Sequence, residues 1–63
     1  MEGKPKILVV DDEQSHRIML RAVLGEEGYS VTEASDGTEA VKAVDREAFD
    51  IVLLDIRMTD MDG

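Results

Sequence analysis

The hydrophobic pattern of the chain contains two short, continuous apolar runs. Residues 7–10 read ILVV, with three β-branched side chains, and residues 51–54 read IVLL. Runs of this length without alternation are typical of strands buried on both faces of a parallel sheet. Residues 29–34 alternate weakly and have modest apolar content, which predicts a further strand at the edge of the sheet rather than at its centre.

Between the strands predicted at 7–10 and 29–34, apolar residues recur at helical spacing. The stretch from about residue 14 to residue 27 predicts an amphipathic helix, with Arg17 and Arg21 on its solvated face. Either Gly28 or Gly25 could end this helix, and Gly28 is the expected C-cap. The apolar stripe of the helix consists of His16, Met19, Leu20, Val23 and Leu24.

A second helix is predicted from Asp36, which can act as its N-cap with Glu39 three residues later, to about residue 47. Its apolar stripe consists of Ala40, Val41 and Val44. The predicted elements then alternate as strand, helix, strand, helix and strand. This βαβαβ order implies parallel strands joined by right-handed crossovers, and therefore an α/β, doubly wound sheet. Ligands of such sheets bind beyond the carboxyl ends of the strands.

Composition narrows the classes of function. The chain has 63 residues, of which 15 are acidic and 7 basic, a net charge of −8 and no cysteine. This charge repels nucleic-acid phosphates and anionic membranes, so we expect no direct nucleic-acid binding by this segment and no membrane contact. The absence of cysteine excludes disulfides and thiolate metal sites. Because there is neither a long apolar span nor a signal-peptide core, we expect a cytoplasmic location.

Three carboxylates follow the two apolar runs. Asp11 and Asp12 come directly after the first run, and Asp55 comes directly after the last. Parallel pairing would bring them to one edge of the sheet, where their repulsion favours a hard divalent cation such as Mg²⁺. Such a cation can neutralise a phosphoryl group while a carboxylate attacks phosphorus, and Asp55 is the expected nucleophile. A single acidic residue after a strand is equally well explained as a solvated turn former, but three at two strand ends indicate a site.

The sequence resembles the response-regulator receiver family over nearly its whole length. The matching motifs are ILVVDDE at 7–13, ASDGTEA at 34–40, DIVLLDI at 50–56 and MTDMDG at 58–63. The resemblance implies that residues 1–63 form a truncated receiver domain, the βαβαβ half of a flavodoxin-like sheet. It implies a signalling segment rather than an enzyme, phosphorylated on Asp55 by a sensor histidine kinase. It also implies Mg²⁺ bound by Asp11, Asp12, Asp55 and the backbone carbonyl of Arg57.

Within the family, the opening segment and the first predicted helix are most similar to receivers of the NtrC type. The chain departs from the family pattern at Thr59, where a proline with fixed φ is usual. Family members also continue for about another half domain, which supplies a Ser or Thr after the fourth strand and a Lys after the fifth. These residues report and bind the phosphoryl group in the family, so we expect the chain to have the acceptor without the readout.

Other interpretations of the motifs fit less well. Haloacid-dehalogenase-like phosphatases have an Asp-x-Asp signature, which the DDE at 11–13 does not match. Residues 60–63 begin like a calcium loop, but no bidentate Glu follows them. We expect His16 to pack or to serve the N-terminus of its helix, rather than to bind metal or carry a phosphoryl group.

A hypothesis from a different class is that the chain is a structural fragment that self-associates and performs no phosphotransfer. The strand at 51–54 is central in a receiver sheet of order 2-1-3-4-5, but here it would be an open apolar edge without Lys or Pro. Two copies could pair these edges antiparallel, giving the order 2-1-3-3′-1′-2′. We therefore expect a homo-oligomer, and a dimer first of all, rather than a well-folded monomer.

Overall fold

The computed structural model describes residues 3–55, which form three strands and two helices. The elements are β1 (Lys6–Val10), α1 (Gln14–Glu26), β2 (Ser30–Ala34), α2 (Gly37–Arg46) and β3 (Ile51–Leu54). The predicted βαβαβ order is confirmed, and each boundary lies close to its expected position. The expectations for Arg57 and Thr59 concern residues outside the described part of the chain.

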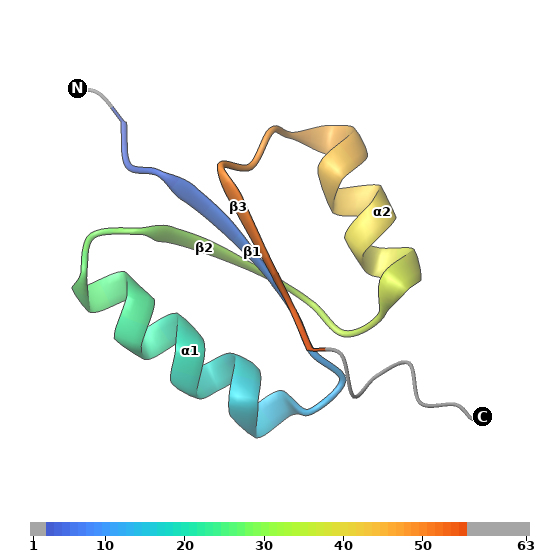
Figure 1. The fold of residues 1–63 in the computed structure, drawn as a ribbon, viewed down its shortest axis with the longest axis horizontal. Helices are drawn as coiled ribbons and strands as arrows, with labels where there is room; N and C mark the ends of the chain where they lie inside the picture. Colours follow the sequence, from blue (N-terminus) through green and yellow to red (C-terminus); the bar gives the residue numbers. More distant parts are fainter. Residues whose placement is uncertain (1–2, 56–63) are drawn as a thin grey trace.

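The strands form one parallel sheet with the order β2-β1-β3. β1 is central and pairs with both neighbours, so that Val10 is level with Ala34 on one side and with Leu54 on the other. The two helices lie on opposite sides of the sheet (Figure 1). The doubly wound architecture and the edge position of β2 are therefore confirmed.

The core is built around β1, whose four apolar residues are almost completely buried. Leu8 and Val10 pack with Ala34 on the face covered by α2, next to the partly buried Ala40, Ala43 and Phe49. Because side chains alternate along a strand, Ile7 and Val9 point to the opposite face, towards α1. Continuous apolar sequence in β1 follows from this burial on both sides.

Both helices face the sheet through narrower stripes than their sequences predict. In α1, Leu20 and Leu24 are half-buried, but Met19 and Val23 are 55% and 54% exposed. In α2 the inward residues are alanines, and the expectation that Val41 and Val44 belong to the buried stripe is wrong, as they are 66% and 51% exposed. The reason is that the helices contact β1 and β2, and within residues 3–55 no other element packs over the apolar residues turned away from those two strands.

The helix ends follow the local sequence signals. After α1, Gly28 has a φ of 97°, its N–H donates to the carbonyl of Gly25, and the N–H of Tyr29 donates to that of Leu24. This is the glycine-dependent end predicted at Gly28. At the start of α2, the Asp36 carboxylate accepts a 2.8 Å hydrogen bond from the N–H of Glu39, as predicted.

β3 is the least buried strand of the described chain. Its four residues, Ile51 to Leu54, are between 37% and 59% exposed. The interpretation of this run as a strand buried on both faces is wrong here, whereas the expectation of an open apolar edge is confirmed, because within residues 3–55 β3 pairs with β1 alone. In the same part of the chain, neither helix has the length and hydropathy needed to cross a membrane.

Candidate functional site

The strand register brings Asp11 and Asp55 to the same edge of the sheet. Each follows a residue of the Val10–Leu54 pair, so the two aspartates leave neighbouring strands at the same level. The backbone N–H of Asp55 donates a 3.0 Å hydrogen bond to the carbonyl of Val10, and that of Asp11 donates to the carbonyl of Ala34 at 3.1 Å. Both aspartates are thus anchored by backbone hydrogen bonds that continue the sheet.

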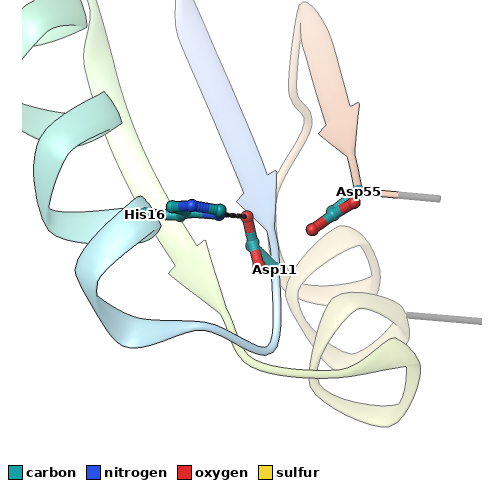
Figure 2. A group of neighbouring side chains, drawn as sticks. All are labelled: Asp11, His16 and Asp55. Atoms are coloured by element: carbon teal, nitrogen blue, oxygen red, sulfur yellow. Dashed lines mark hydrogen bonds and ion pairs between the residues drawn. The ribbon is translucent and has the colours of Figure 1, made fainter. Parts of the chain in front are cut away.

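The Asp11 carboxylate is buried and oriented by the turn that follows it. The residue is only 4% exposed. Its Oδ1 accepts a 2.9 Å hydrogen bond from the backbone N–H of Glu13, and its Oδ2 lies 3.2 Å from Nδ1 of His16. Figure 2 shows His16 reaching from the start of α1 towards Asp11, with the Asp55 side chain extending from β3 towards the same point.

Asp11, His16 and Asp55 form the group of possible metal ligands found among the described residues. Each offers one ligand atom, and these atoms all lie within 4.8 Å of one another. Asp12 is exposed in the turn between β1 and α1 and does not belong to this group. The sequence-predicted pairing of Asp11 with Asp55 is present, a third member is a histidine, and the carbonyl of Arg57 lies outside the described residues.

An arginine network holds the turn beside these residues. Arg17 Nη1 donates to the backbone carbonyl of Asp11 at 2.6 Å, and its Nε donates to a Glu33 oxygen at 3.2 Å. Arg21 donates to the other Glu33 oxygen at 3.0 Å. The side chain of Arg17 is only 14% exposed, so the expectation of a solvated helix face is wrong for this residue, and for Arg21 it is correct.

The charges of this network change the titration of Glu33. The hydrogen bond from Arg21 holds the pKa of the Glu33 carboxyl below its ordinary value, against the opposing effect of partial burial, and the hydrogen bond from Arg17 lowers it further. Glu33 is therefore ionised at neutral pH and satisfies both guanidinium groups. Arg17 contacts the main-chain carbonyl of Asp11 rather than its carboxylate, whose Oδ2 faces His16.

The group lies beside an apolar hollow of about 170 Å³ between α1 and β3. The hollow is lined by Asp11 and Asp55 together with Val9, Val10, Leu20, Leu53 and Leu54. Apolar walls lower the local dielectric, which strengthens both the repulsion between the two carboxylates and the attraction of either for a cation. A larger hollow lies between β2 and α2. Acidic and basic side chains line it, but Asp11 and Asp55 do not.

The donor atoms of the group fit a divalent cation. Two carboxylates held close together on neighbouring strands supply the oxygen ligands that Mg²⁺ takes in proteins. Burial of Asp11 disfavours leaving its charge uncompensated, and the arginine beside it is bound to its carbonyl and to Glu33. This arrangement could hold a cation against a carboxylate at a strand tip.

Comparison with known proteins shows which family the chain belongs to. The model of the response regulator receiver domain matches residues 7–63, which include both aspartates and all the described elements except the first residue of β1. The chain belongs to the response-regulator receiver family. Receivers are signalling modules of two-component systems, and the resemblance noted in the sequence is thereby confirmed.

Relatives of this chain are longer proteins, and the chain matches only part of each. It is 48% identical to the transcriptional regulatory protein ZraR of Salmonella typhimurium over 63 residues, all of this chain and 14% of that protein. It is 45% identical to sporulation initiation phosphotransferase F of Bacillus subtilis over 58 residues, 92% of this chain and 47% of that protein. ZraR is an NtrC-type regulator, in agreement with the subfamily resemblance.

The fold comparison agrees with the sequence comparisons. The structure of the chemotaxis response regulator CheY4 of Vibrio cholerae superposes with a TM-score of 0.85 at 38% identity, over 95% of this chain and 50% of that one. The flavodoxin-like receiver fold is therefore confirmed. The receiver segment spans about half the length of CheY4 and of phosphotransferase F.

The sequence predicts other roles for two residues near the site. It predicts that His16 packs or serves the helix N-terminus; His16 does lie in the first turn of α1, but its ring faces Asp11. It predicts Arg17 on the solvated face, whereas Arg17 donates a hydrogen bond to the Asp11 carbonyl. The usable signal was the spacing: residues five and six positions after Asp11 fall on the first turn of a helix that starts directly after the aspartate turn.

Proposed function

We propose that the chain is the phosphoacceptor segment of a two-component response regulator, and that in the full-length protein Asp55 receives a phosphoryl group with the assistance of Mg²⁺. The observation that supports this proposal is the juxtaposition of Asp55, at the tip of β3, with the buried carboxylate of Asp11, their ligand atoms lying within 4.8 Å. Family membership gives the class of function. The position of Asp55 at the tip of β3 supports its choice as the acceptor.

In the proposed step, a carboxylate oxygen of Asp55 attacks the phosphorus of a phosphohistidine on a sensor histidine kinase. The new O–P bond forms as the P–N bond breaks, and the imidazole nitrogen that leaves keeps the bonding electron pair and later takes a proton from solvent. The product is an acyl phosphate on Asp55. A bound Mg²⁺ would supply charge neutralisation for the transferred oxygens.

The residues around Asp55 have separate tasks in this proposal. Asp11 would hold the cation, fixed by the Glu13 N–H, and Asp12 and the carbonyl of Arg57 would complete the ligand set as the family resemblance implies. A kinase partner agrees with the similarity of this chain to the CAI-1 autoinducer sensor kinase/phosphatase CqsS of Vibrio cholerae, 43% identical over 58 residues, 92% of this chain and 8% of that protein. The same proposal includes two further points. Residues 1–63 are the first half of an NtrC-type receiver domain, and the protein is located in the cytoplasm.

The test is to locate the phosphoryl group. The full-length protein that carries this segment is incubated with a small phosphodonor and Mg²⁺, and the modified residue is identified by mass spectrometry. We expect the label on Asp55, its loss in Asp55→Asn, and its retention in Asp45→Asn, an exposed aspartate on α2. Label on Asp11 or Asp12, with Asp55→Asn still modified, would contradict the assignment.

A second function is favoured by the exposure of β3. Its four apolar residues, and the edge that pairs with no other strand within residues 3–55, are what a second strand would cover. The exposed Ile18 and Met19 of α1 add apolar surface. We infer that residues 1–63 studied by themselves associate through β3, in the antiparallel order 2-1-3-3′-1′-2′, which sends the two Asp55 side chains to opposite ends of the sheet. In that state the segment performs no phosphotransfer.

A further inference from the structure

The candidate cation site contains a nitrogen donor in addition to its carboxylates. Nδ1 of His16 lies 3.2 Å from Oδ2 of Asp11, and His16, Asp11 and Asp55 each present a ligand atom within 4.8 Å of the others. His16 is the one histidine of the sequence. A set of two carboxylates and one imidazole differs chemically from an all-oxygen set.

The local fold fixes this nitrogen next to the Asp11 carboxylate. Oδ1 of Asp11 is taken by the N–H of Glu13, which turns Oδ2 towards α1. His16 occupies the first turn of that helix, and its own N–H is bonded to the carbonyl of Glu13 at 3.1 Å. The His16 side chain is 37% exposed, against 6% for that of Asp11, so an ion can reach the pair from the His16 side.

The separation of the two donor atoms matches a shared cation. Two ligands bound to Zn²⁺ at about 2.0–2.2 Å with tetrahedral angles lie roughly 3.3–3.6 Å apart. The observed 3.2 Å between Nδ1 and Oδ2 is close to that value. A cation between them would take the place of the proton in their hydrogen bond.

The choice of metal follows from ligand chemistry. Mg²⁺ takes oxygen ligands in near-octahedral geometry and gives up water reluctantly. Imidazole nitrogen suits the later first-row transition metals. Their affinity for a site of nitrogen and oxygen ligands is higher than that of Mn²⁺, which stands at the start of the series. Replacing an oxygen ligand or a water by His16 therefore raises the affinity for Zn²⁺ and Co²⁺ and does little for Mg²⁺.

We propose that His16 is a metal ligand of this chain, and that Asp11, His16 and Asp55 together bind a divalent transition cation such as Zn²⁺ or Co²⁺ more tightly than Mg²⁺. This inference rests on the proposed function, because it takes the cation site between Asp11 and Asp55 as given. The competing role for His16 is to position Asp11 by a hydrogen bond. Loss of a positioning residue weakens binding of all cations alike.

The experiment measures the affinities of the full chain for Mg²⁺, Co²⁺ and Zn²⁺ by titration, together with the visible absorption of bound Co²⁺ and the ¹⁵N resonances of the single imidazole. We expect His16→Asn to lower Co²⁺ and Zn²⁺ affinity about tenfold or more, by analogy with the cost of disturbing a metal's ligand shell, and to change Mg²⁺ affinity less than threefold. Zn²⁺ should also shift one ring nitrogen of the unsubstituted protein strongly. Ser15→Ala, exposed in the same turn, is the control and should change neither.

Three outcomes separate the proposals. Equal loss of affinity for all three metals in His16→Asn, or an imidazole spectrum unchanged by Zn²⁺, overturns the role of His16 as a ligand and leaves the phosphoacceptor proposal intact. Mg²⁺ and Co²⁺ affinities that are both unchanged by Asp11→Asn and Asp55→Asn overturn the shared premise of a cation site. Selective loss of Co²⁺ and Zn²⁺ with a shifted ring nitrogen supports the inference.

Discussion

Arg17 and Asp11 are joined by a 2.6 Å hydrogen bond from the guanidinium Nη1 to the backbone carbonyl. The bond ties the first turn of α1 to the residue that begins the site. The same guanidinium also donates to Glu33 on β2. One side chain of α1 therefore connects that helix to β2 and to Asp11, the residue that follows β1. The shape of the turn that presents Asp11 therefore depends on a charged residue that is almost fully covered.

Replacing Arg17 should weaken the fold more than replacing its neighbour in the network. We expect Arg17→Gln to lower the free energy of unfolding by about 1.5–3 kcal/mol, the range for hydrogen bonds to charged groups. Arg21→Gln, at a residue whose side chain is 64% exposed, should cost only about 0.2–1 kcal/mol. Chemical denaturation of both variants measures the difference. Equal effects would show that burial of the Arg17 contact contributes nothing.

Acid should remove the contribution of Glu33. Its carboxyl pKa is lowered in the folded chain, chiefly by the hydrogen bond from Arg21. A carboxyl group of this kind stabilises the fold fully above its unfolded-state pKa, near the ordinary value of 4.5, and the stabilisation is lost as the pH falls through the lower folded value. We expect Glu33→Gln to cost about 1 kcal/mol at pH 7 and progressively less below pH 4.5.

This pH dependence is measured by denaturation at a series of pH values from neutral to acid. Glu26→Gln, an exposed glutamate at the end of α1, is the control and should follow the unsubstituted chain at every pH. If the cost of Glu33→Gln stayed constant down to strongly acidic pH, the two arginines would not be acting on the ionised carboxylate.

The cap of α2 should be worth a measurable amount. The Asp36 side chain accepts a 2.8 Å hydrogen bond from the Glu39 N–H, one of the helix donors without a partner inside the helix. We expect Asp36→Ala to cost about 0.5–2 kcal/mol and Asp36→Asn, which keeps an acceptor oxygen, to cost less. Thr38→Ala in the same exposed turn is the comparison. An Asp36→Asn cost equal to that of Asp36→Ala would argue against a capping role.

The open edge of β3 should determine the association state of residues 1–63. We expect a dimer at micromolar concentration, since a stable interface of more than about 1,000 Å² is within reach of two paired edges and the adjoining helix faces. Val52→Lys puts a charge on that edge strand and should prevent association, whereas Val41→Lys, at a more exposed valine of α2, should not. Sedimentation equilibrium distinguishes the cases. A monomer that unfolds cooperatively would show that the segment closes its own core.

Much of the fold was determined by local sequence. The apolar runs at β1 and β3, the cap at Asp36 and the glycine at Gly28 each act through the nearest few residues, so their positions were predictable. The meeting of Asp11 with Asp55 was predictable for a related reason. Both follow parallel strands directly, and the carboxyl ends of parallel strands share one edge of the sheet.

The tertiary structure alone decided which side chains turn inward from the helices. The rotation of α1 about its axis is set by packing against β1 and β2. It turns Arg17 partly inward and leaves Met19 and Val23 exposed, although periodicity predicts the reverse. The same rotation brings the His16 ring to Asp11. Helical spacing defines the direction of a stripe only to within about one residue, roughly 100° around the axis. A hydrogen bond or a shared cation depends on tenths of an ångström, which packing between elements supplies.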